Sequence, residues 1–115
     1  MTLQELKDLR YKEIDSTTGY LIAQGFTFGG YDFSLSETAQ INWTNLNLLP
    51  DGVYPITIST NTEDIYILQL VDRDNFYLAA VSAKMTPLNT GSALKKLIYD
   101  CVDDACVNLI EDNRI

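Results

Sequence analysis

The pair Gly29-Gly30 is the feature that most constrains how this chain folds. It stands between two short aromatic runs, FTF before it and YDF after it. The favoured two-residue hairpin turn needs positive φ at both central positions, which glycine adopts without steric cost. The spacing therefore predicts an antiparallel hairpin with three cross-strand pairs: Phe26 with Phe33, Thr27 with Asp32 and Phe28 with Tyr31.

The four aromatic side chains of this hairpin are expected on one face, because side chains alternate along a strand. An isolated two-stranded hairpin is marginal in water, so its aromatic face needs a covering element. We therefore favour a core role beneath a helix, and an exposed stacking platform for a sugar or a protein is the alternative. A phosphate loop is excluded, since the stretch has neither the GxGxxG nor the GxxxxGK[ST] spacing.

Helical patterns flank the hairpin on both sides. A capping-box pattern at residues 2–5 begins a helix that is expected to run to about Gln24. Residues 16–19 of that helix, Ser-Thr-Thr-Gly, are weak helix formers and permit a kink. Serine caps at residues 34–36 begin a second helix, which the turn at residues 50–52 ends.

Two strand-like runs and two helical patterns complete the chain. The strands are expected at residues 54–59 and 65–70. In the second strand, apolar residues occupy both odd and even positions, so the pattern does not show which face points inward. A helix from about residue 72 is expected to break at Thr86-Pro87. A last helix is expected over residues 89–110, where apolar residues recur at helical spacing.

The element order α-ββ-α-ββ-α-α predicts an α+β fold in which helices cover small antiparallel β-hairpins. No low-complexity segment interrupts residues 1–115, so a single domain is expected. Hydrophobic residues make up 46% of the 115 residues, which suffices for a core.

The formal net charge is −8, from 8 basic and 16 acidic residues. Nucleic-acid phosphates and anionic membrane surfaces repel such a chain, so neither is expected as a partner. The charge either keeps protein molecules apart or forms an acidic face for a basic partner, or mimics nucleic acid. The chain has no apolar run long enough for a membrane span, and its first residues are too charged for a signal peptide. We expect it to be made and kept in a cytoplasm unless a larger assembly carries it out.

The two cysteines, Cys101 and Cys106, lie in a stretch that is expected to be helical. Their separation places them about 140° apart around a helix axis. Their Cα atoms would then be more than about 7 Å apart, too far for a bridge within the helix. Two reduced cysteines that pack as small hydrophobes are therefore expected, and a bridge between subunits is the alternative.

Histidine is absent, which removes the commonest general base and metal ligand. Ser-His-Asp and Cys-His schemes are excluded, and two cysteines alone do not build a structural zinc site. The paired carboxylates lie at turns and helix ends, where acids serve as caps and solvated charge. The stretch DRDN lacks the glycine and the closing glutamate of a calcium loop. We expect no catalytic, cofactor-binding or metal-binding residue, and no small-molecule substrate.

The order of motifs along residues 10–114 is more telling than any single motif. RYKEIDSTTGYLIAQGFTFGGYDFSLSETAQINW carries a Lys-Glu-Ile core, a Gly-Phe, an aromatic hairpin, Ser-Leu-Ser and Ala-Gln-x-Asn-Trp. DNFYLAAV, GSALKK and the closing DNR follow in the second half. In this order the chain resembles a small domain family of tailed bacteriophages, whose members are encoded among tail and tail-fibre genes.

The resemblance implies a phage structural role and supplies no catalytic residues, because the family is a domain of unknown function. One departure is Ser16-Thr17-Thr18-Gly19, where a better helix former is expected. Many relatives sit at the end of a longer tail protein, whereas this domain is expected to stand alone and therefore to dock onto its neighbours.

These observations favour a non-enzymatic virion structural component that acts in the tail, baseplate, neck or tail-fibre attachment. It would be made in the host cytoplasm and would contact other phage structural proteins, in several copies of a symmetric assembly. An assembly chaperone for a tail or fibre protein is the first alternative, and an acidic inhibitor of a host defence complex is the second. The candidate contact surface comprises Tyr31, Asp32, Trp43 and Tyr54.

Overall fold

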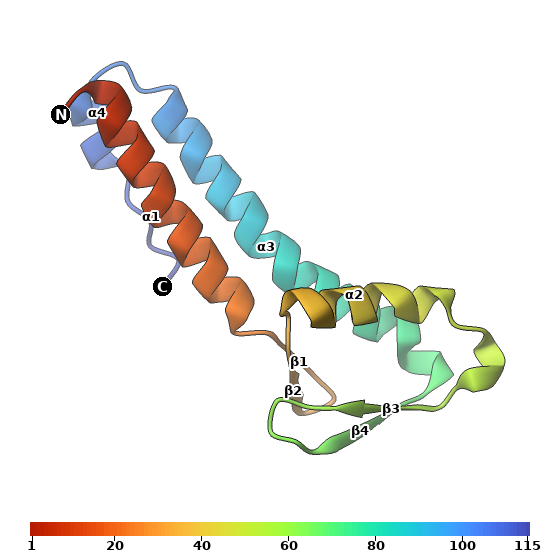
Figure 1. Ribbon diagram of the computed structural model, residues 1–115. Coiled ribbons are helices and arrows are strands. Elements are labelled where there is room, and N and C mark those ends of the chain that lie inside the picture. Colours follow the sequence, from red (N-terminus) through yellow and green to blue (C-terminus); the bar gives the residue numbers. More distant parts are fainter. The chain divides into compact units, whose positions relative to one another are not determined.

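The computed structural model describes all 115 residues, and its elements follow the order α-ββ-α-ββ-α-α (Figure 1). The helices are α1 (Leu3–Ala23), α2 (Glu37–Asn45), α3 (Arg73–Tyr99) and α4 (Asp104–Leu109). The strands are β1 (Phe26–Phe28), β2 (Tyr31–Phe33), β3 (Ile56–Ser59) and β4 (Ile65–Leu68). β1 pairs with β2 and β3 pairs with β4, so the predicted α+β fold with two antiparallel hairpins is confirmed.

The contacts of the chain group into two compact units, each with its own core. Residues 22–85 form the hairpin unit, which holds both hairpins, α2 and the first part of α3. Residues 1–21 and 86–115 form the helical unit, which holds most of α1, the rest of α3 and α4. The expectation of a single domain over residues 1–115 stays a prediction.

The β1–β2 hairpin has the predicted turn and register. Gly29 and Gly30 have φ of 60° and 83°, and Phe26, Thr27 and Phe28 pair with Phe33, Asp32 and Tyr31. Phe26 and Phe33 are buried, Phe28 is half-buried, and Tyr31 is 37% exposed at the margin. The core role of this aromatic face is therefore confirmed for three of its four rings.

The core of the hairpin unit is built around Phe76 of α3, which is fully buried. Its ring packs edge-on to those of Phe33, Trp43 and Phe26, with centroid distances of 5.0, 5.2 and 5.3 Å. The serine cap of α2 is also confirmed, because the Ser36 hydroxyl accepts the Ala39 N–H at 3.2 Å.

The β3–β4 hairpin turns through three residues, in a geometry that fixes which side chains face the core. The Thr60 N–H donates to the Asp64 carbonyl at 2.9 Å, and the Glu63 N–H donates to the Thr60 carbonyl at 3.1 Å. Glu63 has a φ of 62°, as the bulge position of such a turn requires. In the register that results, Ile58 and Leu68 are buried, whereas Ile65 and Ile67 are exposed.

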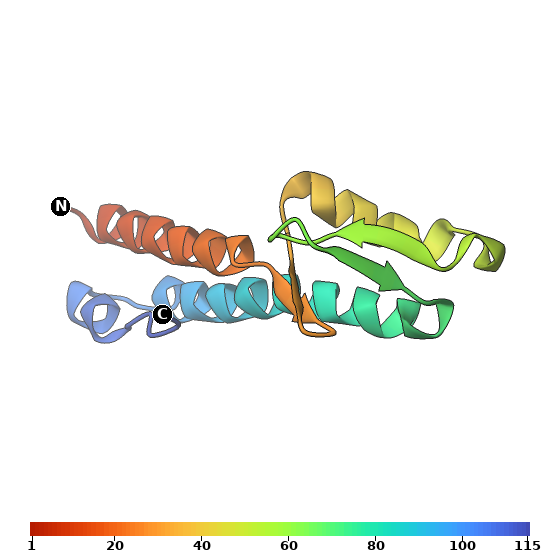
Figure 2. The ribbon, with the colours of Figure 1, turned by 90° about the horizontal axis from the view of Figure 1, so that it is seen from below.

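In the helical unit, α1 and the last part of α3 run side by side in opposite directions (Figures 1 and 2). Their shared core contains Ile14, Ile98, Cys101 and Val107. The predicted capping box is confirmed at the start of α1, since the Thr2 hydroxyl accepts the Glu5 N–H and the Glu5 carboxylate accepts the Thr2 N–H. The helix is continuous through Ser16–Gly19.

The predicted helix break at Thr86-Pro87 is wrong. α3 is one helix of 27 residues, and Pro87 lies inside it. Proline removes the backbone donor that would reach the Ala83 carbonyl, four residues earlier, and the turn around Pro87 makes additional hydrogen bonds to side chains. The Thr90 hydroxyl donates to the carbonyls of Thr86 and Pro87 at 2.9 and 3.2 Å. Arg114 donates to the Pro87 carbonyl at 3.0 Å. The residues predicted to begin a last helix, 89–92, therefore lie inside α3.

The prediction of two reduced cysteines is also wrong, because Cys101 and Cys106 form a disulfide with a Cα–Cα distance of 5.5 Å. The error lay in treating the stretch as one helix. α3 ends at Tyr99, and the chain turns before α4 begins. The Asp103 carboxylate accepts the Cys106 N–H at 2.8 Å and caps α4 in a new direction. This change of direction brings the two Cα atoms within bridging range.

Reduction of the disulfide is expected to lower the free energy of unfolding by about 2 kcal/mol, the chain-entropy value for so short a loop. The measurement is urea unfolding with and without dithiothreitol. The Cys101→Ala, Cys106→Ala double variant is the control and should not respond to the reductant. Equal midpoints for the wild-type chain in both conditions would show that the bridge does not constrain the unfolded state.

Candidate functional site

The four residues of the predicted contact surface divide into two pairs. Tyr31 and Asp32 are exposed on β2, where Asp32 accepts the Thr27 hydroxyl at 2.8 Å. Trp43 is buried, and its indole N–H donates to the Ser34 carbonyl at 2.8 Å. Tyr54 is half-buried, and its hydroxyl donates to the Leu46 carbonyl at 3.1 Å.

These hydrogen bonds give Trp43 and Tyr54 roles in the packing of the hairpin unit. A buried tryptophan or tyrosine usually places its polar atom on such a backbone acceptor. The four residues therefore do not form one surface, and only Tyr31 and Asp32 are available to a partner in this structure.

A more prominent exposed apolar feature is the outward face of the β3–β4 hairpin, which we call the outer β4 surface. It consists of Ile65 and Ile67 on β4 and their cross-strand neighbours Ser59 and Thr57 on β3. The two isoleucines are 63% and 54% exposed. Figure 2 shows β3 and β4 from the side on which neither α2 nor α3 covers them. An exposed apolar strand face of this kind is typical of an interaction site.

This surface was not predicted from the sequence, although a signal for it was present. Apolar residues occupy both parities of the IYIL stretch. The structure shows that one parity, Tyr66 and Leu68, faces the core, while Ile65 and Ile67 face outward. In a two-stranded sheet with a helix layer on one side only, the second apolar parity has no core to enter.

The free edge of β4 lies beside this surface. Hydrogen-bonded and non-hydrogen-bonded pairs alternate along an antiparallel ladder. The Thr60–Asp64 bond fixes the first pair, so Ile58–Tyr66 and Ile56–Leu68 are the bonded pairs that follow. The N–H and C=O groups of Ile65 and Ile67 consequently point away from β3.

A shallow groove of about 210 Å³ lies elsewhere on the hairpin unit, between α2 and α3. Trp43, Leu35 and Ala80 line it, and Lys84 and Gln40 also contribute. The groove is smaller than typical ligand pockets and contains no carboxylate among its lining residues.

The hairpin unit is strongly acidic. Residues 22–85 contain seven acidic and two basic side chains. One of the two cations, Arg73, is paired with Asp51 at 3.2 Å and with Asp74 at 3.4 Å. The outer β4 surface itself carries no charge, so it is an apolar strip on an acidic unit.

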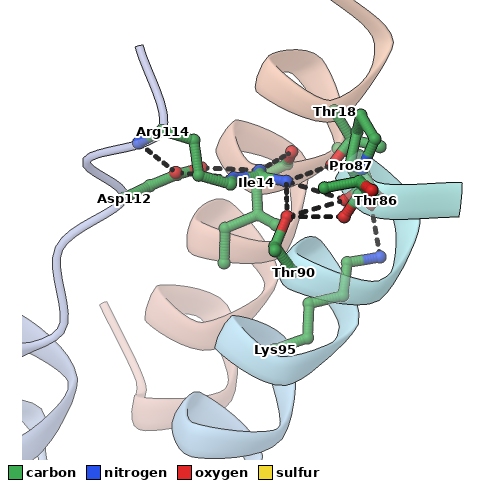
Figure 3. Close-up of polar contacts among 9 residues, drawn as sticks. Ile14, Thr18, Thr86, Pro87, Thr90, Lys95, Asp112 and Arg114 are labelled. Atoms are coloured by element: carbon green, nitrogen blue, oxygen red, sulfur yellow. Dashed lines mark hydrogen bonds and ion pairs between the residues drawn. The ribbon is translucent and has the colours of Figure 1, made fainter. Parts of the chain in front are cut away.

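The most extensive polar cluster of the helical unit centres on Arg114, as Figure 3 shows. The guanidinium donates to both carboxylate oxygens of Asp112, at 2.8 and 2.7 Å. It also donates to the Ile14 carbonyl at 2.9 Å, to the Thr18 hydroxyl at 2.9 Å and to the Pro87 carbonyl at 3.0 Å. Every nitrogen of Arg114 is engaged, so the cluster fastens the C-terminal segment to α1 and α3 and leaves no donor for a ligand.

The electrostatics of this cluster agree with a structural role. The hydrogen bonds from Arg114 lower the pKa of the Asp112 carboxyl, against a smaller opposing effect of burial. The same contacts raise the pKa of Arg114. A fully paired ion pair of this kind holds its geometry but has no free position for proton transfer.

Nowhere in the chain do three carboxylates or thiols converge as a metal site would require. None of the helices combines the length and the apolar composition that crossing a bilayer requires. Comparisons with protein-family models, with curated proteins and with solved structures find no match to this chain.

Gly91→Ala is expected to destabilise the chain, although alanine normally favours a helix interior over glycine by about 1 kcal/mol. A Cβ at Gly91 would lie 2.6 Å from the Thr18 hydroxyl and 3.0 Å from Nη1 of Arg114. The matched control is Gly19→Ala in α1, where a Cβ meets no atom within 4 Å. Urea unfolding should show opposite signs for the two substitutions, and a gain in stability for both would mean that α1 does not approach α3 at Gly91.

Asp112→Asn is expected to reduce stability at neutral pH, with an effect that fades in acid. The folded-state pKa of Asp112 is below its usual value, so its contribution is present above the unfolded pKa of about 4. That contribution is lost as the pH falls through the lowered folded pKa. Urea midpoints at pH 7 and in steps below pH 4 measure the difference from wild type.

The matched control for this titration is Glu111→Gln, since no hydrogen bond or ion pair within the chain engages Glu111. At pH 7 its midpoint should lie much closer to that of the wild type than the midpoint of Asp112→Asn does. A constant difference between Asp112→Asn and wild type from pH 7 into strong acid would contradict a charged Asp112 in the folded state.

Proposed function

We propose that this protein is a non-enzymatic structural component of a bacteriophage virion that acts through protein–protein contacts. The observation that carries the proposal is the outer β4 surface, where Ile65 and Ile67 are exposed beside an unpaired strand edge. The motif order from Arg10 to Arg114, which resembles a domain of tail and tail-fibre proteins, supports the setting. The tail, baseplate, neck and tail-fibre attachment are the places where such a domain would dock, in several copies.

Two further observations support a structural role. The best-formed polar cluster, around Arg114 and Asp112, is saturated by contacts within the chain. The Cys101–Cys106 disulfide suits a protein that works outside the reducing cytoplasm, as a released particle does. Synthesis in the host cytoplasm followed by incorporation into the particle agrees with both.

Mass spectrometry of density-purified particles tests the proposal, in a phage that lacks the gene and is complemented with a plasmid copy. The wild-type chain should be present at a fixed copy number relative to the tail proteins. Ile67→Lys should reduce that number at least about tenfold, because a charge then enters an apolar contact. The matched control is Ile41→Lys, at an isoleucine of α2 that is 61% exposed and is not part of the outer β4 surface.

Each outcome has a defined meaning. Absence of the wild-type chain from particles that contain abundant tail proteins would refute the structural role. Recovery of the chain bound to a tail or fibre protein in lysate, but not in particles, would indicate the assembly chaperone instead. Loss of incorporation with Ile41→Lys alone would move the contact to the exposed face of α2.

A further inference from the structure

We propose that the free edge of β4 binds an extended segment of a partner protein with lysine or arginine at its ends. The segment would add to the β3–β4 hairpin as a third strand. This inference rests on the proposed function, because it names the binding mode and the partner chemistry of the same surface.

The first support is the set of unpaired backbone groups on β4. The hairpin register directs the N–H and C=O groups of Ile65 and Ile67 away from β3. No hydrogen bond within the chain engages these four groups, and β4 has no second neighbouring strand. A docked strand would find two donors and two acceptors at the spacing of a β-ladder.

The second support is that β4 has neither a proline nor a charged side chain to protect its free edge. Exposed strand edges usually carry a proline, a charged side chain or a bulge that discourages pairing. The edge of β3 has Pro55 directly before its first residue, and Pro55 has no N–H to offer. The edge of β4 has neither proline nor charge from Ile65 to Leu70.

The third support is the charge at the two ends of the strand. Glu63 and Asp64 precede β4, and Asp72 follows it, whereas the strand itself is neutral. A segment with an apolar centre and basic ends is complementary to this pattern. A second copy of the chain would bring its own acids to the same ends, so like-charge repulsion disfavours it as the occupant.

Hydrogen–deuterium exchange of the full chain, followed by NMR, tests the inference with a synthetic peptide. The peptide has the centre Val-Thr-Val-Thr-Val and two lysines at each end. Its valines would lie opposite Ile65 and Ile67, so their N–H groups would point at β4. At saturating peptide, exchange of the Ile65 and Ile67 amides should slow at least about tenfold, a protection typical of new backbone hydrogen bonds.

Two control peptides separate strand addition from charge attraction. The first keeps the lysines but is N-methylated at the valines, which removes the donors that face β4. The second replaces the lysines with glutamates. Both should bind at least about tenfold more weakly, and neither should protect Ile65 or Ile67. Equal binding by the N-methylated peptide, or unchanged exchange at both amides with the lysine peptide, overturns the inference.

Self-association and the proposed function are distinguished by separate readouts. Protection of Ile65 and Ile67 that appears without peptide as the protein concentration rises would assign the edge to a second copy and overturn the choice of partner. Particles that contain the chain while the peptide experiment fails would remove the strand-addition inference alone. Strand addition in vitro with no chain in particles would remove the virion role alone.

Discussion

The packing around one ring, Phe76, is the interaction on which the hairpin unit depends. Neither two-stranded hairpin is stable alone, and each has an aromatic or aliphatic face that must be covered. Phe76 reaches both, with ring centroids 5.0 Å from Phe33 and 6.5 Å from Tyr66. It also lies 5.2 Å from Trp43 of α2. The edge-to-face pairs with Phe33 and Trp43 contribute about 1 kcal/mol each beyond burial, and the Tyr66 ring is stacked. One side chain of α3 therefore contacts β2, β4 and α2.

This core accounts for one face of the β3–β4 hairpin and leaves the other unexplained. Ile58, Tyr66 and Leu68 pack inward, and their apolar character is what folding requires. Ile65 and Ile67 do not contact that core, and a polar residue at either position would leave Phe76 and its neighbours unchanged. An exposed apolar strand face on a small acidic unit is what the proposed docking of a partner requires.

Sequence patterns predicted the parts of this fold that local chemistry determines. The register of β1–β2 followed from Gly29-Gly30, and the cap of α2 followed from Ser36, because both depend on residues a few positions apart. Pro87 lies inside α3, and its carbonyl accepts hydrogen bonds from the Thr90 hydroxyl and from Arg114, which is distant in the sequence. Arg114 can lie here only because Gly91 has no Cβ, which would be 3.0 Å from Nη1 of Arg114. In the sequence, however, Gly91 resembles a helix start.

The candidate site was harder to predict than the fold for a related reason. Aromatic residues such as Trp43 and Tyr54 attract attention as binding residues, yet the same rings are what a small core most needs. The double apolar parity of β4 was visible, but its meaning depended on knowing that only one face of the hairpin is covered. The Cys101–Cys106 bridge was missed because the turn before Asp103 interrupts an apolar pattern that itself continues.

The acidic charge of the hairpin unit gives the open strand edge two properties at once. An unprotected edge normally invites pairing between identical copies, which leads to aggregation. Here each copy carries seven acidic and two basic side chains in residues 22–85, and three of the acids flank β4. The approach of a second copy therefore brings like charges together along the pairing direction. The same field would favour a strand with basic ends, so in the proposed binding mode one charge pattern both opposes pairing between identical copies and selects the partner.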